Sequence, residues 1–231
     1  LRFNAGKTMM IAQQLYEGID IGKRSPVGLI TYMRTDSTHV APEALKEVRS
    51  LILKNFGKDY LPQRPNVYKL KKHAQAAHEA IRPSLISHSP ESLKEFLTAD
   101  QYKLYELIYR RFIASQMTPA RYLVTTANIT AEKFLFTASG TTTIFDGFMA
   151  LYNNDNDEEK EKNILPSLVK DEILDLIKLM PSQHFTKPPA RFSDSSLVKV
   201  LEEEGIGRPS TYAPIIYTLV LRDYARRIKG Y

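Results

Sequence analysis

The chain has 231 residues, a formal net charge of +6 and no cysteine, and 43% of its residues are hydrophobic while 25% are charged. This composition is typical of a soluble globular chain with one large or two smaller domains, and it excludes disulfides and thiolate metal sites. No apolar run approaches the roughly 20 residues that a membrane span requires, and the modest positive charge favours an anionic partner such as nucleic acid, although a basic cytosolic enzyme has a similar charge.

The two ends of the sequence indicate a piece of a longer protein. The chain begins at Leu1 and stops at Tyr231, shortly after a basic run. Its first residues lack the charged and then apolar layout of a signal peptide. We therefore expect an excised fragment of a soluble, cytoplasmic protein.

The first expected helix begins at a cap on Thr8, continues to about Glu17 and ends at Gly18. The Asn-Ala-Gly-Lys-Thr sequence at its start could suggest a phosphate-binding loop. However, the Walker pattern requires a glycine five positions before Gly6, where this sequence has Leu1. The pattern therefore favours a capped helix over a nucleotide site.

The next segment, residues 28–38, is expected to contain a buried strand with reactive side chains. Alternation along a strand would place Tyr32, Arg34 and Asp36 on one face. A tyrosine in an apolar strand is commonly a core residue with a solvated hydroxyl. A phenol can also attack phosphorus to form a phosphotyrosine ester, while a nearby arginine binds the phosphoryl oxygens. The residues alone leave both interpretations open.

Two helices are expected after this strand. Pro42 can begin a packing helix that Gly57 ends. The alanine-rich residues 73–82, followed by proline, predict a second helix with His78 and Arg82 on one face. A lone histidine on such a helix is commonly a surface residue, but an imidazole can also donate a hydrogen bond to a phosphoryl oxygen.

The middle of the chain changes from helical to strand-like composition near residue 118. A helix is expected from Pro90, and a longer one follows the capping box of Thr98 and Gln101, with its tyrosines in the core. Threonine-rich, β-branched segments then predict strands over 122–130, 132–138 and 141–145, with a hairpin turn at residues 139–140. Residues 153–162 read as a solvated loop, and residues 169–180 have the periodicity of a helix.

The last segment predicts two helices joined by a tight turn. Ser193 can cap the first helix, and Gly205 ends it. The second would begin at a turn whose N–H groups, together with Arg208, Ser210 and Thr211, could hold a phosphate. A capped helical hairpin with an exposed arginine explains the same residues equally well.

Three of these segments resemble, in order, the motifs of the type IA DNA topoisomerases. They are GLITYMRTDST at residues 28–38, HAQAAHEAIRP at residues 73–83, and the run from residue 183 that contains GRPSTY. Met33 lies where the related topoisomerase III enzymes usually carry proline, so the bacterial topoisomerase I enzymes are the more similar group.

The resemblance implies roles for specific residues. Tyr32 takes the place of the nucleophile that bonds to the 5′ phosphate of a cut strand, and Arg34 that of the phosphate-binding arginine. His78 takes the place of a histidine near the scissile phosphate. The resemblance also implies DNA-contacting or supporting roles for Asp36, Ser37, Glu79, Arg82, Arg208, Ser210 and Thr211.

The resemblance also implies an α+β, mainly α, multidomain fold that forms part of the family's ring. Residues 1–118 would form a helical domain with the catalytic tyrosine, residues 119–185 a β-rich hinge domain, and residues 186–231 an incomplete helical segment that binds single strands. It favours a strand over residues 169–180 in place of the helix that periodicity suggests.

The cofactor and partners follow from the same resemblance. The complete enzyme would use Mg²⁺ held by a TOPRIM domain before this region, and zinc ribbons would follow it, so we expect this fragment to bind no metal. We expect it to be a monomer associated with the nucleoid that binds single-stranded DNA without turnover. The alternatives are a non-catalytic DNA-binding module and the topoisomerase part of a reverse gyrase.

Overall fold

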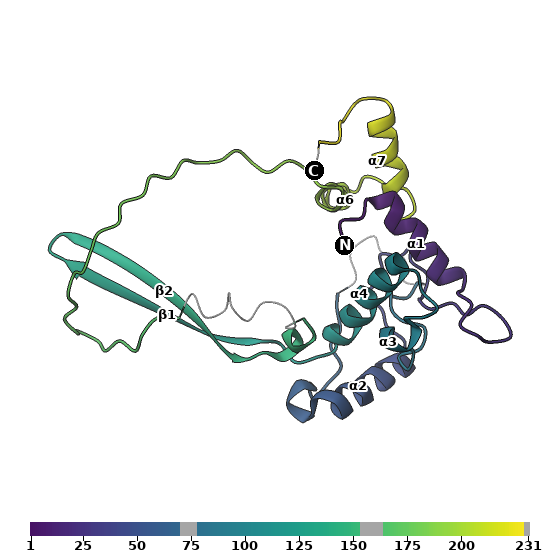
Figure 1. Cartoon of the computed structure of the whole chain (residues 1–231), viewed down its shortest axis with the longest axis horizontal. Helices are drawn as coiled ribbons and strands as arrows, with labels where there is room; N and C mark the ends of the chain where they lie inside the picture. The colour runs from purple at the N-terminus through teal and green to yellow at the C-terminus, as the bar shows by residue number, and fades with distance from the viewer. Residues whose placement is uncertain (70–77, 153–163, 229–231) are drawn as a thin grey trace. The chain divides into compact units, whose positions relative to one another are not determined.

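The computed structural model describes residues 1–69, 78–152 and 164–228 (Figure 1). The chain divides into two compact units. The first combines Leu1–Met117 with Ala190–Tyr231, and the second is Thr118–Pro189. The described residues form helices and one two-stranded sheet. The broad prediction of a mainly helical α+β chain is therefore confirmed, while the division into three named domains stays a prediction.

Helix α1, Ala5–Glu17, begins earlier than the sequence predicted. Its cap is Asn4, whose side chain accepts a hydrogen bond from the backbone N–H of Lys7 at 2.7 Å. Thr8 lies inside the helix and donates its hydroxyl to the carbonyl of Asn4. Asparagine is a stronger cap than threonine, which accounts for the shift. The Asn-Ala-Gly-Lys-Thr sequence is thus the first helical turn.

The other helices of the first part of the chain have the caps that the sequence predicted. Helix α2, Pro42–Phe56, has proline in its first turn and Gly57 at its end with a φ of 91°, and a 3₁₀ turn, Lys58–Tyr60, follows it. Helix α3, Pro90–Leu93, is a single turn. Helix α4, Ala99–Ser115, starts with the capping box of Thr98 and Gln101.

The core of the first unit takes its buried side chains from α1, α2, α4 and the segment between α1 and α2. Its buried side chains include Leu15, Leu29, Ile30, Val48, Ile52, Tyr105 and Ile113. The hydroxyl of Tyr105 donates to the carbonyl of His88 at 2.6 Å, and that of Tyr109 donates to the carbonyl of Ile86 at 2.9 Å. Burial raises the pKa of Tyr105. Tyr105 is thus a core residue, as predicted, and Tyr109 is another, whereas Tyr102, also predicted in the core, is only half-buried.

Helices α6 and α7 follow the second unit in the sequence and belong to the first. Helix α6, Asp194–Glu203, starts with a capping box formed by Ser193 and Ser196. It ends at Gly205, which has a φ of 72°, and the next N–H donates back to the carbonyl of Leu201. Helix α7, Tyr212–Leu221, packs against α1 (Figure 1).

The second unit contains one antiparallel hairpin in place of the three predicted strands. Strand β1, Arg121–Ala131, pairs with β2, Phe134–Phe145. The turn is Glu132-Lys133, with Glu132 at a φ of 50°. Residues 139 and 140 lie inside β2, opposite Thr126 and Thr125. The predicted turn at residues 139–140 is therefore wrong, because a two-residue turn at 132–133 matches the strand twist and lets both strands pair over their whole length.

The rest of the second unit has little regular structure. A 3₁₀ turn, Gly147–Leu151, follows the hairpin. Residues 169–180 form neither the strand that we predicted nor the helix that their periodicity suggests, and Ile173 and Ile177 are 94% and 96% exposed. Neither form is stabilised because no described segment pairs with this backbone or covers its apolar side chains. The predicted loop over 153–162 lies outside the described residues.

Among the helices of the described ranges, none combines the length and apolar character that a membrane span requires.

Candidate functional site

The segment that carries Tyr32 is attached to the end of helix α1. The backbone N–H of Leu29 donates to the carbonyl of Leu15 at 2.7 Å. A Cβ atom on Gly28 would lie 2.7 Å from the carbonyl oxygen of Tyr16, so only glycine allows this close approach. A bridge between Ile19 and Val27 closes the loop between the helix and the segment. The nucleophile candidate is therefore held by local contacts.

The segment is not the regular strand that the sequence predicted. Its one described bridge joins Ile30 to Pro83, and the chain bends at residues 31, 33 and 34. Met33 is buried, whereas Tyr32, which is 38% exposed, and Arg34 lie at the surface. The predicted alternation thus holds over residues 32–34. It does not extend in a straight strand to Asp36, because the N–H groups of Ser37 and His39 donate to the hydroxyls of Thr35 and Ser37 and not to a neighbouring strand.

The predicted helix over residues 73–82 is wrong for its described part. Residues 78–83 are not helical, and residues 70–77 lie outside the described ranges. The hydroxyl of Thr31 donates to the carbonyl of Ala80 at 2.7 Å, and the N–H of Thr31 donates to the carbonyl of Arg82 at 2.9 Å. The N–H of Arg82 donates to the hydroxyl of Thr31 at 2.9 Å. These bonds replace the i to i−4 bonds of a helix.

This pairing brings His78 next to Tyr32. Their ring centroids lie 5.7 Å apart with a tilt of 58°. On another side, the ring of Tyr16 meets that of Tyr32 edge to face at 5.3 Å. Both distances are in the range of favourable aromatic contacts. Tyr16 lies within the first predicted helix, which assigned it no role in the site, and its position just before the reactive segment was the available signal.

Glu79, which follows His78 in the sequence, forms an ion pair with Arg82. The guanidinium donates to both carboxylate oxygens, at 2.8 and 3.0 Å, and the same carboxylate accepts the N–H of Ala41 at 2.7 Å. Burial disfavours the charged form of Glu79, but the bonds from Arg82 and Ala41 outweigh it and hold its pKa below the ordinary value. In this structure, both side chains support the segment that carries His78.

Arg34 and Ser37 differ in their surroundings. Within the described residues, the guanidinium of Arg34 has no hydrogen-bond or ion-pair partner. Ser37 is buried, and its hydroxyl accepts the N–H of His39 at 3.1 Å. Asp36 is half-buried and has an interaction of its own. Arg34 is thus available to an anion, whereas Ser37 shapes the turn after it.

The turn before α7 differs from the sequence prediction. Three of its backbone N–H groups already have partners: that of Arg208 donates to the hydroxyl of Thr211 at 2.8 Å, and those of Thr211 and Tyr212 donate to the carbonyl of Arg208. The prediction failed because the turn closes on itself. Arg208, Ser210 and Thr211 nevertheless have exposed side chains. A phosphate would therefore be held by side chains.

The described residues do not fit a metal site. In residues 1–69, 78–152 and 164–228, no group of three or more histidine, aspartate or glutamate side chains could hold a metal ion. The Mg²⁺ site that the resemblance implies was predicted to lie outside this chain, so the chemistry below is derived from the side chains of the described residues alone.

Comparison with known proteins gives consistent results. A family model described as DNA topoisomerase matches residues 1–231. The chain is 52% identical over 229 residues to DNA topoisomerase 1 of Rickettsia felis, covering 97% of this chain and 29% of that protein. It is 50% identical over 227 residues to DNA topoisomerase 1 of Helicobacter pylori, covering 98% and 30%. The chain thus spans less than a third of these relatives.

A solved structure is also similar. The full-length topoisomerase I from Thermotoga maritima matches the whole chain with a TM-score of 0.78 and 38% sequence identity, over 37% of that protein.

Proposed function

The chain belongs to the DNA topoisomerase family, and on this premise we propose that it carries the nucleophile of a type IA enzyme. In the complete protein, the enzyme would cut and reseal one DNA strand without ATP and so relax negative supercoils. The observation that carries the proposal is the contact between the ring of an exposed Tyr32 and the ring of His78, with Arg34 exposed two residues further along the chain.

The proposed reaction is a reversible transesterification. The phenolic oxygen of Tyr32 loses its proton and attacks phosphorus, while the bond from phosphorus to the 3′ oxygen of the preceding nucleotide breaks and that oxygen gains a proton. The 5′ phosphate is then an ester of Tyr32. Attack by the 3′ hydroxyl reverses each step and reseals the strand. The ester conserves the energy of the broken bond, so that no other energy source is needed.

Arg34 and His78 have supporting roles in this proposal. Arg34 binds the nonbridging oxygens as negative charge develops on the phosphoryl group, and His78 donates a hydrogen bond to the same group. Glu79 and Arg82 hold His78 in place through their bonds to each other and to Ala41. Asp36 and Ser37 shape the chain that follows Arg34.

The exposed side chains of Arg208, Ser210 and Thr211 would hold the backbone of the strand that leads to Tyr32. We expect a preference for single strands, because an unpaired backbone must pass Tyr32. We also expect a monomer in the bacterial nucleoid. The chain alone would bind single strands without turnover, since it spans under a third of the relatives that it matches.

The test is to trap the covalent intermediate. Full-length enzyme with Tyr32→Phe should form no DNA adduct with a single-stranded oligonucleotide, while its affinity should stay within a few-fold of the unchanged enzyme. Adducts at normal yield would eliminate Tyr32 as the nucleophile and favour a non-catalytic DNA-binding module. An ATPase domain attached to the same protein would identify a reverse gyrase.

A second test uses the chain itself. The 231-residue chain should bind single-stranded DNA but leave negatively supercoiled plasmid unrelaxed in the presence of Mg²⁺. Catalytic relaxation that disappears with Tyr32→Phe would show that the catalytic machinery is complete within these residues, contrary to the proposal.

A further inference from the structure

Helix α1 connects the two parts of the proposed DNA-binding surface. Near its start, Met9 lines a cavity of about 320 Å³ together with Val198 from α6 and Tyr212 from α7. At its other end, Tyr16 contacts Tyr32. Met9 and Tyr16 are seven residues apart in the helix, which separates them by about 10 Å, the length of about three nucleotides of a strand. The position of α6 and α7 on α1 therefore sets the distance from the Arg208 turn to the nucleophile.

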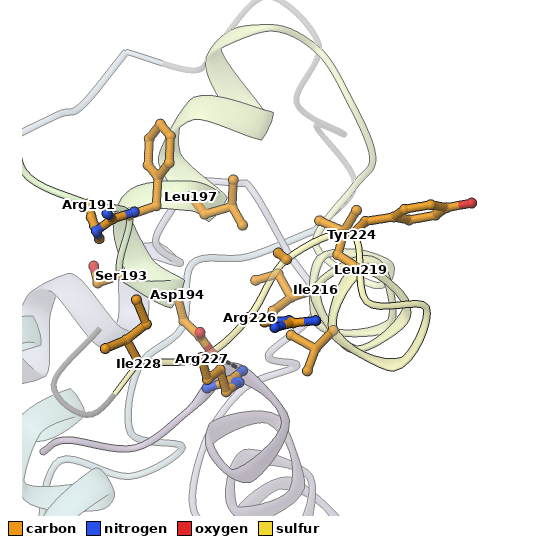
Figure 2. Close-up of a pocket in the computed structure, with 13 residues that line it drawn as sticks. Arg191, Ser193, Asp194, Leu197, Ile216, Leu219, Tyr224, Arg226, Arg227 and Ile228 are labelled. Atoms are coloured by element: carbon orange, nitrogen blue, oxygen red, sulfur yellow. Dashed lines mark hydrogen bonds and ion pairs between the residues drawn. The ribbon is translucent and has the colours of Figure 1, made fainter.

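Asp194 makes the hydrogen bonds that join these helices, and we call this set of bonds the tie. It is the first residue of α6, and its carboxylate accepts the backbone N–H of Ala5, the first residue of α1, at 2.8 Å. The same oxygen accepts a hydrogen bond from Arg227 at 3.0 Å, and the pair lies beside the cavity drawn in Figure 2. The side chain of Asp194 is only 22% exposed.

The location suits a carboxylate. The first N–H groups of a helix have no partner within the helix, and the positive end of the helix dipole attracts negative charge. Asn4 caps the N–H of Lys7, while Asp194 satisfies that of Ala5. One carboxylate thus lies at the starts of both α1 and α6.

Two cavities adjoin Asp194, so few other contacts could replace its hydrogen bonds. Asp194 lines both the 320 Å³ cavity and a second one of about 420 Å³ between α6, α7 and residues 224–228. The atoms that line a void lack van der Waals partners on that side. The hydrogen bonds of Asp194 are therefore needed to fix how α6 sits on α1.

We propose that Asp194 is a positioning residue that holds the Arg208 turn at a fixed distance and direction from Tyr32. A strand bound at the turn then presents one phosphodiester to the nucleophile. This inference rests on the proposed function, and Asp194 itself touches neither DNA nor the reacting atoms.

Two changes remove the tie in different ways. Asp194→Ala removes the carboxylate with both of its bonds. Ala5→Pro removes only the N–H donor, and proline is well tolerated at the first position of a helix. Asn4 is already extended, with a ψ of 166°, as a residue before proline should be. The matched control is Asp223→Ala, which breaks an exposed ion pair with Arg226 in the segment that follows α7.

The first measurement needs no activity. The chain has no cysteine, so Glu17→Cys and Tyr217→Cys provide two specific sites for spin labels on exposed positions of α1 and α7. We expect Asp194→Ala and Ala5→Pro to broaden the distribution of label distances, and Asp223→Ala to leave it unchanged. If the distribution stays narrow in both test variants, the tie does not position these helices.

The second measurement follows where full-length enzyme cuts a single-stranded oligonucleotide. Misplacement by 1 Å can cost about 10²-fold in rate. We expect both test variants to form adducts at least about 10-fold more slowly per bound complex and to spread cleavage to neighbouring phosphodiesters. A uniform fall in yield with an unchanged cleavage pattern would instead indicate a merely structural role and overturn the proposal.

The two measurements separate this inference from the proposed function. If Tyr32→Phe retains adducts in the cleavage assay, the proposed function fails and the positioning of a nucleophile has no meaning. If Tyr32→Phe abolishes them while Asp194→Ala and Ala5→Pro behave like the Asp223→Ala control, the nucleophile stands and the role of Asp194 is wrong.

Discussion

The imidazole of His78 faces the phenol of Tyr32 with ring centroids 5.7 Å apart, although the two residues belong to separate segments. In the proposed reaction, His78 donates to the phosphoryl group, and loss of one preorganised donor typically lowers a rate about 10²- to 10³-fold. We expect His78→Ala to slow adduct formation to this degree in full-length enzyme with little change in affinity. Single-turnover cleavage of a bound oligonucleotide measures it. His88→Ala is the control, and a His78→Ala enzyme that binds weakly but cleaves bound DNA normally would contradict us.

The effect of Arg34 on the rate should depend on the shape of its guanidinium and not on its charge alone. A lysine carries the same charge but cannot form the bidentate contact with phosphoryl oxygens. Arg34→Ala is expected to slow adduct formation about 10²- to 10³-fold, and Arg34→Lys should recover only part of that loss. The measurement is again the rate of adduct formation at saturating DNA. Full activity of Arg34→Lys would show that a point charge suffices.

The pair of Glu79 and Arg82 should stabilise the fold in a pH-dependent way. The pKa of Glu79 is lowered on folding, so its stabilising effect is fully present above its ordinary value of 4.5 and is lost as the pH falls through the folded value. Glu79→Gln should therefore lower the free energy of unfolding by about 1–3 kcal/mol at neutral pH, because Arg82 loses a charged partner. Chemical denaturation at pH 7 and near pH 4 measures the difference.

The matched control for that pair is Glu106→Gln. Glu106 and Arg110 form an ion pair at 2.7 Å on α4, in which Glu106 is as exposed as Glu79 but Arg110 is 33% exposed against 12% for Arg82. Its loss should cost only about 0.3–0.5 kcal/mol. Equal losses of unfolding free energy in the two variants would contradict this prediction. So would a loss for Glu79→Gln that grows as the pH falls.

Gly28 and Gly6 should respond oppositely to the same substitution. Gly28→Ala would place a Cβ atom 2.7 Å from the carbonyl oxygen of Tyr16, and we expect a loss of about 1–3 kcal/mol from the shift that relieves this clash. Gly6 lies in the first turn of α1, where its nearest neighbour would be at an ordinary 3.5 Å. Gly6→Ala should raise stability by up to about 1 kcal/mol. Thermal unfolding of the two variants decides the matter, and a tolerated Gly28→Ala would disprove the close approach.

Arg208 should contribute to affinity and little to chemistry. Log affinity for single strands falls with log salt by about 0.7 for each phosphate neutralised, so Arg208→Ala should reduce the slope by about that amount. The cleavage rate of bound complexes should stay within a few-fold. Titration of a labelled oligonucleotide at several salt concentrations measures the slope, with Lys199→Ala on α6 as the control. An unchanged slope for Arg208→Ala would remove this turn from the DNA-binding surface.

The sequence predicted most accurately those features that depend on nearby residues. The capping box of Thr98 and Gln101, the Ser193 cap and the glycines at helix ends are formed by atoms a few positions apart, and all appear in the structure. The shifted start of α1 is a small error of the same kind, because Asn4 and Thr8 both suit a cap.

The errors arose where distant segments compete with local preference. Alanines favour a helix around His78, yet Thr31 pairs with the backbone of Ala80 and Arg82 and holds the described part extended. The hairpin was divided at the wrong turn because pairing along its whole length outweighs the local signal of Ser139-Gly140. The neighbours Tyr32 and His78 could be brought together only through resemblance, since no local pattern links them.

The attachment of residues 78–84 to Thr31 also determines the order in which the site forms. The contact of Leu29 with Leu15 closes a short loop, whereas the bonds of Thr31 to Ala80 and Arg82 close a much longer one, and the entropy of loop closure rises with length. Contacts that are far apart in sequence also form slowly during folding. The ring of Tyr32 should therefore meet Tyr16 before it meets His78. A newly made chain would thus hold its nucleophile in place before the imidazole reaches it, and hydrogen exchange during refolding should protect Leu29 earlier than Arg82.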